Sequence, residues 1–91
     1  MSKTVDVLYS KGFKKQHAAL PDDIKRKAAK AVGFFMENVL HPSLRIHKLS
    51  GKLKGLWSIS IDRRCRIIMR PMKDNTYLFI SIGDHAIYEK M

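Results

Sequence analysis

A histidine and a tyrosine lie close together near the end of the chain, in the stretch ISIGDHAIYEK, as His85 and Tyr88. An imidazole titrates near neutral pH and can take up or release a proton in general acid–base catalysis. Cleavage of an RNA phosphodiester requires a base for the 2′-hydroxyl, cations for the charged phosphorane and an acid for the leaving oxygen. Gly83 permits a turn just before these residues, so we expect both at the rim of the preceding strand. A capping or packing role is the alternative for a single histidine in this place.

Positive charge gathers upstream of that turn, in HKLSGKLKGLWSISIDRRCRIIMR, residues 47–70. The whole chain has 18 lysines and arginines against 8 aspartates and glutamates, a formal net charge of +10. Such an excess of positive charge favours the binding of polyanions, by counterion release if the partner is nucleic acid and by electrostatic steering for any polyanion. An acidic protein or an anionic membrane surface would satisfy the same charge, and a solvated surface without a partner is the simplest alternative.

Length and cysteine content exclude several classes of protein. The 91 residues predict a single domain with one core over residues 1–91. Cys65 is the only cysteine, which excludes a disulfide within the chain and a cysteine-based zinc site, and a reducing, cytoplasmic setting fits best. We find no signal-peptide pattern and no apolar run of the roughly 20 residues that span a bilayer.

Metal binding is not expected either. The remaining histidines, His17, His41 and His47, show no HxxxH or comparable ligand spacing. His17 falls on a predicted helix and His41 precedes a proline, so we interpret both as structural. The sequence therefore predicts no metal site and no cofactor.

The apolar periodicity predicts the elements that position these residues. Residues 4–9 alternate as a strand, and two helices follow, one from a Ser10 cap and one from Pro21 to about His41. After a loop over residues 43–55, LWSISI, CRIIMR and TYLFISI predict three strands joined by hairpins. The order β-α-α-β-β-β predicts an α+β fold in which a helical hairpin packs on one face of a mostly antiparallel four-stranded sheet.

Side chains alternate between the two faces of a strand, so each predicted strand can be sorted. The face under the helices should hold Trp57, Ile59, Ile61, Cys65, Ile67, Met69, Leu78, Ile80 and Ile82. The uncovered face should hold Ser58, Ser60, Arg64, Arg66, Ile68, Arg70, Tyr77, Phe79 and Ser81. Guanidinium groups beside aromatic rings suit phosphates and unpaired bases, whereas the alternative is a wet face with arginine stems over the rings. An error of one residue in register would reverse this assignment.

Several motifs, taken in order, resemble the RelE/ParE superfamily of type II toxins over essentially the full length. They are SKGFKK after the first strand, the helical hairpin, the loop HKLSGKLKG, the strands LWSISI and RCRIIMR, and the closing ISIGDHAIYEK. The resemblance implies the RelE/ParE fold and an mRNA interferase, an endoribonuclease that cleaves mRNA in the ribosomal A site without a metal. It further implies an acidic antitoxin encoded beside the toxin and action on the ribosome in the cytoplasm.

The resemblance also assigns roles to residues of this chain. The loop and the GDH turn look most like the YafQ branch of the superfamily, whose catalytic histidines fall on His47 and His85. The arginine that stabilises the transition state falls on Arg66, and the C-terminal aromatic residue that contacts the substrate matches Tyr88. The cations expected to hold RNA are Lys48, Lys52, Lys54, Arg64 and Arg70.

This sequence departs from the family pattern on its central strands. Ser58 and Ser60 stand where RelE-type toxins carry lysines, and Ser60 and Arg64 stand where YafQ-type toxins carry a histidine and an aspartate. Cleavage could then depend on His47, Arg66 and His85, or be weak or absent. The ParE branch shares the fold and inhibits DNA gyrase, and a binder of that kind is the alternative function. His85 favours the interferase, because a gyrase inhibitor has no evident need for an acid–base residue there.

Overall fold

The structure is a computed structural model and describes residues 5–84 and 86–89. Its elements in chain order are β1 (Asp6–Tyr9), α1 (Lys11–Ala18), α2 (Asp22–Glu37), η1 (Pro42–Leu44), β2 (His47–Lys48), η2 (Gly51–Leu53), β3 (Trp57–Ser60), β4 (Arg66–Pro71), β5 (Thr76–Gly83) and α3 (Ala86–Glu89), where η marks a 3-10 helix. Within these residues no helix is long and apolar enough to cross a bilayer.

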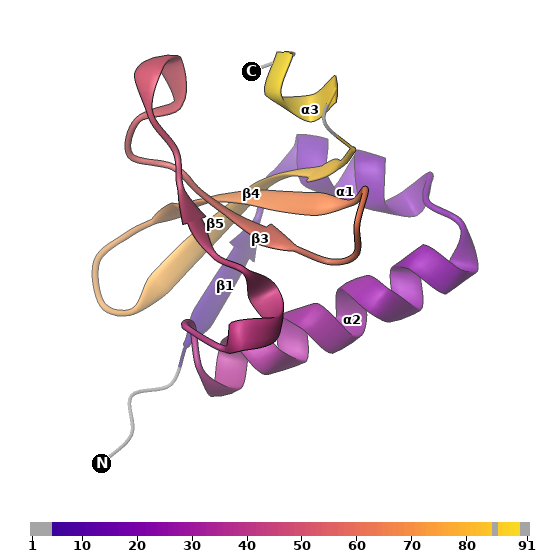
Figure 1. The fold of residues 1–91 in the computed structure, drawn as a ribbon, viewed down its shortest axis with the longest axis horizontal. Helices are drawn as coiled ribbons and strands as arrows, with labels where there is room; N and C mark the ends of the chain where they lie inside the picture. The colour runs from indigo at the N-terminus through magenta and orange to yellow at the C-terminus, as the bar shows by residue number, and fades with distance from the viewer. Residues whose placement is uncertain (1–4, 85, 90–91) are drawn as a thin grey trace.

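A single sheet with the strand order β1-β5-β4-β3-β2 forms the centre of the fold (Figure 1). Strands β2 to β5 pair antiparallel with their neighbours, and β1 joins β5 in parallel. The predicted α+β fold with a mostly antiparallel sheet is therefore confirmed. The structure adds a short strand, β2, inside the region predicted as a loop, because His47 and Lys48 pair with Ser58 and Trp57.

Local signals in the sequence set the two long helices. The Ser10 side-chain oxygen accepts a hydrogen bond from the Phe13 N–H at 3.0 Å and donates to the Ile80 carbonyl at 2.8 Å, so the α1 cap also ties the helix to β5. Helix α2 begins after Pro21 with two aspartates in its first turn, where carboxylates complement the helix dipole. The starts of both helices agree with the prediction, but α2 ends at Glu37, before the predicted end at about His41.

The main core lies between these helices and the sheet. Phe35 from α2 is fully buried, and its ring lies 4.9 Å from the Tyr77 ring and 5.7 Å from the Phe79 ring of β5, measured between centroids. The buried members of this core are Val5, Phe13, Ala28, Ala31, Phe35, Leu44, Ile59, Cys65, Ile67, Met69, Tyr77, Phe79 and Ile82. On β3 and β4 the sorting by alternation is confirmed, since Ile59, Ile67 and Met69 all point into this core.

On β5 the predicted faces are largely wrong. Tyr77 and Phe79, expected on the uncovered face, lie in the main core, and Ile80, expected in the core, packs on the other side. The cause is a β-bulge: Met69 pairs with Phe79 while Ile68 pairs with Ser81, which leaves Ile80 as an extra residue. The extra residue reverses the alternation for the rest of the strand. Beyond the bulge the predicted faces are therefore correct again, and the prediction that Ile82 lies in the core is confirmed.

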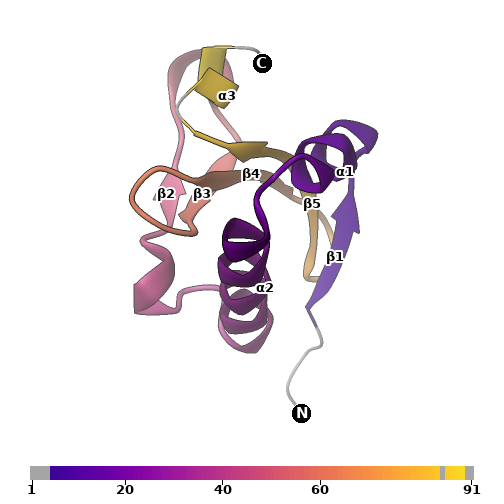
Figure 2. The ribbon, with the colours of Figure 1, turned by 90° about the vertical axis from the view of Figure 1, so that its right-hand side faces the viewer.

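The second face of the sheet is not simply open. A smaller core of Leu56, Ile68 and Ile87 lies there, with Leu49, Leu53, Ile80 and Tyr88 packed against it. Helix α3 supplies Ile87 and Tyr88 and covers this end of the sheet on the side opposite α2 (Figure 2). The approach is close, because a Cβ at Gly83 would lie 2.7 Å from Cγ2 of Ile87. The expectation that helices cover only one face is therefore wrong at this end.

Candidate functional site

Arg66 is held at the start of β4, on the second face of the sheet. It pairs with Ser60 on one side and with Gly83 on the other, and its guanidinium Nη1 donates a hydrogen bond to the Ser60 hydroxyl oxygen. Ser60 is buried and the arginine is half-buried. A guanidinium fixed in this way presents its remaining donors in a defined direction, which suits a bound oxyanion.

Register brings further polar side chains onto the same face. His47 of β2 pairs with Ser58 of β3, and partners in an antiparallel pair share a face. The Tyr88 hydroxyl reaches back from α3 and donates to the Ser58 hydroxyl oxygen at 3.2 Å. Ser58 and Ser60 are two residues apart on β3 and therefore share this face too. The structure thus gathers His47, Tyr88 and Arg66 around two buried serines.

His85 lies outside the described residues. Its neighbours on either side are placed: Gly83 ends β5 beside Arg66, and the Asp84 carboxylate accepts a hydrogen bond from the Ala86 N–H at 2.9 Å. That bond closes an Asx-turn that leads into α3. The catalytic role of His85 remains a prediction from the sequence.

The lysines predicted to hold RNA fall at different places. Lys48 pairs with Trp57 on the face opposite His47, and its ammonium lies 5.4 Å from the centre of the Trp57 ring. Lys52 and Lys54 are exposed in and after η2. Lys48 is therefore separated from the Arg66 face, and the other two lie on the loop that borders it.

The two remaining predicted arginines, Arg64 and Arg70, are both exposed. Arg64 belongs to the turn before β4 rather than to the strand itself. Arg70 lies near the opposite end of β4 from Arg66 and pairs with Leu78. RNA binding by either residue remains a prediction.

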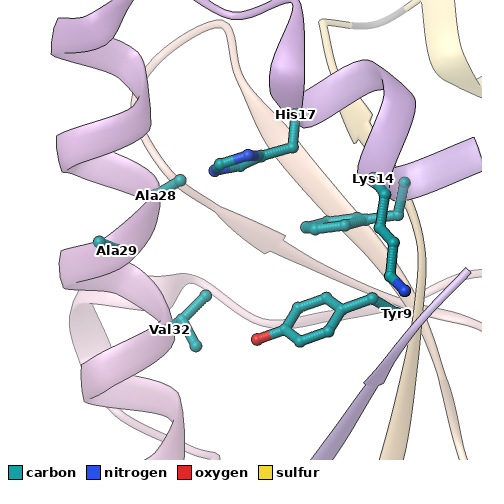
Figure 3. Close-up of a pocket in the computed structure, with 7 residues that line it drawn as sticks. Tyr9, Lys14, His17, Ala28, Ala29 and Val32 are labelled. Atoms are coloured by element: carbon teal, nitrogen blue, oxygen red, sulfur yellow. The ribbon is translucent and has the colours of Figure 1, made fainter.

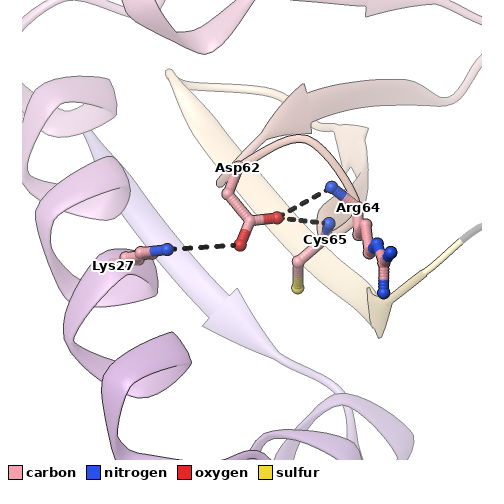
Figure 4. Close-up of polar contacts among 4 residues, drawn as sticks. All are labelled: Lys27, Asp62, Arg64 and Cys65. Atoms are coloured by element: carbon pink, nitrogen blue, oxygen red, sulfur yellow. Dashed lines mark hydrogen bonds and ion pairs between the residues drawn. The ribbon is translucent and has the colours of Figure 1, made fainter.

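The turn before Arg66 is organised by Asp62. One carboxylate oxygen accepts hydrogen bonds from the N–H groups of Arg64 at 2.9 Å and Cys65 at 2.7 Å, and the other lies 3.7 Å from the Lys27 ammonium on α2 (Figure 4). The Cys65 N–H bond is the largest cause that lowers the pKa of Asp62 below its ordinary 3.8, with smaller contributions from Arg64 and Lys27. Asp62 therefore fixes the chain direction just before Arg66.

This arrangement makes stability depend on the charge of Asp62. The folded-state pKa is the lower one, so the carboxylate stabilises the fold above its ordinary pKa, and the contribution is lost as pH falls through the folded-state value. We expect Asp62→Asn, which keeps an acceptor oxygen, to lower the free energy of unfolding by about 1 kcal/mol at neutral pH. Urea unfolding over a pH series should show that the free energies of unfolding of wild type and variant converge in acid. Asp6→Asn, at an exposed position of β1, is the control, and a difference between wild type and Asp62→Asn that stays constant with pH would contradict this account.

Cys65 is not a nucleophile in this site. Burial raises the pKa of its thiol to about 11, and the charges of Asp62 and Asp84 add to the rise. The thiol is therefore neutral at physiological pH and behaves as a small apolar side chain in the main core.

The two histidines interpreted as structural do pack on phenylalanines. His41 stacks on Phe34 at 4.3 Å between ring centroids and accepts a hydrogen bond from the Ser43 N–H through Nδ1. His17 stacks on Phe13 at 6.1 Å. In the part of the chain that the structure describes, no three His, Cys, Asp or Glu side chains gather as a metal site would require.

Beside Arg66 lies a polar cavity of about 340 Å³ that sequence reasoning missed. Its lining consists of Ser43, Arg45, Ser60, Ile61, Asp62, Arg63 and Arg66. Arg45 comes from the segment after η1 and Arg63 from the turn after β3. The available signal was the run Arg63, Arg64 and Arg66, but alternation along a strand cannot place residues of a turn.

A second concavity, of about 470 Å³, lies between α1 and α2 and is mainly apolar (Figure 3). Tyr9 of β1 and His17 of α1 face Ala28 and Val32 of α2 across it, with Lys14 at its side. It shares no lining residue with the cavity at Arg66.

The fold matches those of solved YafQ and YoeB/ParE toxins, which confirms the fold predicted from the sequence. YafQ from E. coli strain BL21(DE3) superposes with a TM-score of 0.76 over 92% of this chain and 97% of that chain, at 19% identity. A YoeB/ParE toxin from Agrobacterium tumefaciens gives a TM-score of 0.76 over 89% of this chain and 99% of that chain, at 13% identity.

A chain of the E. coli DinJ-YafQ toxin-antitoxin complex is similar as well, with a TM-score of 0.74 over 92% of this chain and 96% of that chain, at 20% identity. No protein-family model matches the sequence, and no curated protein matches it significantly. At these identities the likeness establishes the fold, and function has to be argued from the site.

Proposed function

We propose that this chain is the toxin of a type II toxin–antitoxin system and acts as a metal-independent endoribonuclease on mRNA in the ribosomal A site. One observation supports this most directly: Arg66, its guanidinium bonded to Ser60, lies on the same sheet face as His47 and Tyr88. The face combines a fixed cation, an imidazole and a phenol, which are groups that RNA cleavage can use.

Each residue has a distinct part in the proposed reaction. His47 and His85 carry out the two proton transfers: one histidine acts as the base that removes the 2′-hydroxyl proton, and the other acts as the acid that protonates the leaving oxygen. Arg66 stabilises the charge that develops on the phosphorane. Tyr88 contacts a base of the mRNA, with its ring oriented by the hydrogen bond to Ser58.

A cytoplasmic, acidic antitoxin is the proposed partner. The formal charge of +10 favours an acidic chain. Toxins of the same fold have been solved as the DinJ-YafQ complex of E. coli and the YoeB-YefM complex of Staphylococcus aureus. We expect the antitoxin to cover the sheet face that carries Arg66 with a helix or an added strand.

Mapping mRNA 5′ ends shortly after induction of the chain tests the proposed reaction. We expect new ends at defined positions within codons of translated messages, and their disappearance when an antitoxin is co-expressed or translation is blocked. Unchanged mRNA during growth arrest would refute ribonuclease function.

One feature of the site favours a second candidate, a toxin that acts by binding alone, such as a gyrase inhibitor. Both β3 side chains on the candidate face are serines, which carry no charge to hold a phosphate and no group that titrates near neutral pH. Gyrase-dependent DNA breaks on induction, with mRNA intact, would select this candidate.

A further inference from the structure

The cavity beside Arg66 is strongly cationic. Arg45, Arg63 and Arg66 line it together with the hydroxyl groups of Ser43 and Ser60, and Asp62 is its only acid. Three guanidinium groups around one small polar cavity create a field that favours an anion. Arginine is also the side chain whose planar donors fit phosphate oxygens two at a time.

The charges of these arginines are not neutralised within the described residues. The ion pair found there joins Asp62 to Lys27, and both backbone hydrogen bonds to Asp62 come from its own turn. Neither Arg45 nor Arg63 forms an ion pair with a carboxylate in the described part of the chain. The single acid of the cavity is thus engaged elsewhere. Arg45 and Arg63 keep their guanidinium donors for a ligand, and Arg66 keeps those that do not bond to Ser60.

The backbone is held in place by local contacts at both Arg45 and Arg63. Arg45 follows η1 in a left-handed conformation, with φ of 46°, and its neighbour Leu44 is buried in the main core. Its N–H donates to the Pro42 carbonyl at 3.3 Å. Arg63 lies in the turn that Asp62 closes through Arg64 and Cys65. Their backbones are therefore held in place before any ligand arrives, which lowers the entropy cost of binding.

We propose that Arg45 and Arg63 form a second phosphate subsite, which binds the RNA phosphodiester next to the one held at Arg66. This inference rests on the proposed function, since it assigns the same site a longer stretch of RNA backbone. Ser43 borders the subsite and can donate its hydroxyl to a phosphate oxygen. The subsite contacts only the backbone, so it adds affinity and register without base preference.

The test measures binding separately from cleavage. The probe is a short oligoribonucleotide of mixed sequence with 2′-O-methyl groups throughout, which cannot be cleaved, and its Kd is measured over a series of salt concentrations. We expect Arg45→Gln and Arg63→Gln each to raise Kd about tenfold, and the double variant to reduce the slope of log K against log salt by about 0.7. Arg45→Lys should retain most of the slope while losing part of the affinity.

Arg26→Gln is the matched control, because it removes the same charge from an exposed site on α2 outside the cavity. We expect its Kd to stay within about twofold of wild type. Thermal unfolding of each variant verifies that the fold is retained. Equal losses in all three glutamine variants would assign the effect to net charge and overturn the subsite.

The failure of this proposal and the failure of the proposed function are distinguishable. If wild type cleaves mRNA but the Arg45 and Arg63 variants bind the probe as tightly as the Arg26 control, the subsite is refuted alone. If no mRNA is cleaved but those variants still lose probe binding and salt dependence, the subsite stands without the nuclease.

Discussion

Replacing Arg66 by alanine is expected to reduce the rate of mRNA cleavage by about 10²–10³-fold, the usual effect of removing one preorganised donor from a developing charge. Arg66 of β4 pairs with Ser60 of β3 on one side and with Gly83 of β5 on the other, and a hydrogen bond to the Ser60 hydroxyl fixes its guanidinium. Its charge is therefore aimed before the substrate binds. Arg66→Lys keeps the charge and loses the planar fork, so we expect an intermediate loss, mainly in kcat.

Single-turnover cleavage of ribosome-bound mRNA by purified variants measures this effect. Arg26→Ala, an exposed substitution on α2, supplies the control for net charge. Growth arrest on induction should follow the same order, with wild type strongest and Arg66→Ala weakest. Cleavage by Arg66→Ala within threefold of wild type would remove Arg66 from the reaction.

Phe79→Ala is expected to lower the free energy of unfolding by about 3–5 kcal/mol. The ring is fully buried and meets the rings of Tyr9, Phe13 and Phe35 at 5.7 Å between centroids in each case. Truncation would open a cavity among aromatic groups that cannot all move in to fill it. Such a loss is a large part of the stability of a domain of this size.

The neighbouring Leu78 supplies the matched control. It is half-buried on the opposite face of β5, so Leu78→Ala should cost no more than about 1–2 kcal/mol. Urea unfolding of both variants measures the difference. Strict alternation would put Leu78 in the core and Phe79 outside it, whereas the bulged strand does the reverse. The two arrangements of β5 therefore predict opposite orders for the losses in the free energy of unfolding. A greater loss for Leu78→Ala than for Phe79→Ala would therefore contradict the bulge.

The candidate site was predictable only in part, and its residues show why. Arg66, Ser58 and Ser60 could be assigned to one face because β3 and β4 alternate without interruption. His47 could be named from its motif, but its place beside Ser58 depends on β2, a strand too short to leave a periodic signal. Arg45 and Arg63 lie in irregular segments, and only the folded chain brings them to the cavity at Arg66.

The sequence by itself determined the excess of positive charge, the starts of α1 and α2 after Ser10 and Pro21, and the order of β1, α1, α2, β3, β4 and β5, since these depend on local periodicity and composition. It did not reveal β2 or α3. Only the tertiary structure decided which face each residue of β5 occupies, because one extra residue at Ile80 reverses the alternation. It also decided that α3 covers the second face, with Tyr88 reaching Ser58. These features depend on contacts between residues far apart in the chain, and no local pattern encodes such pairings.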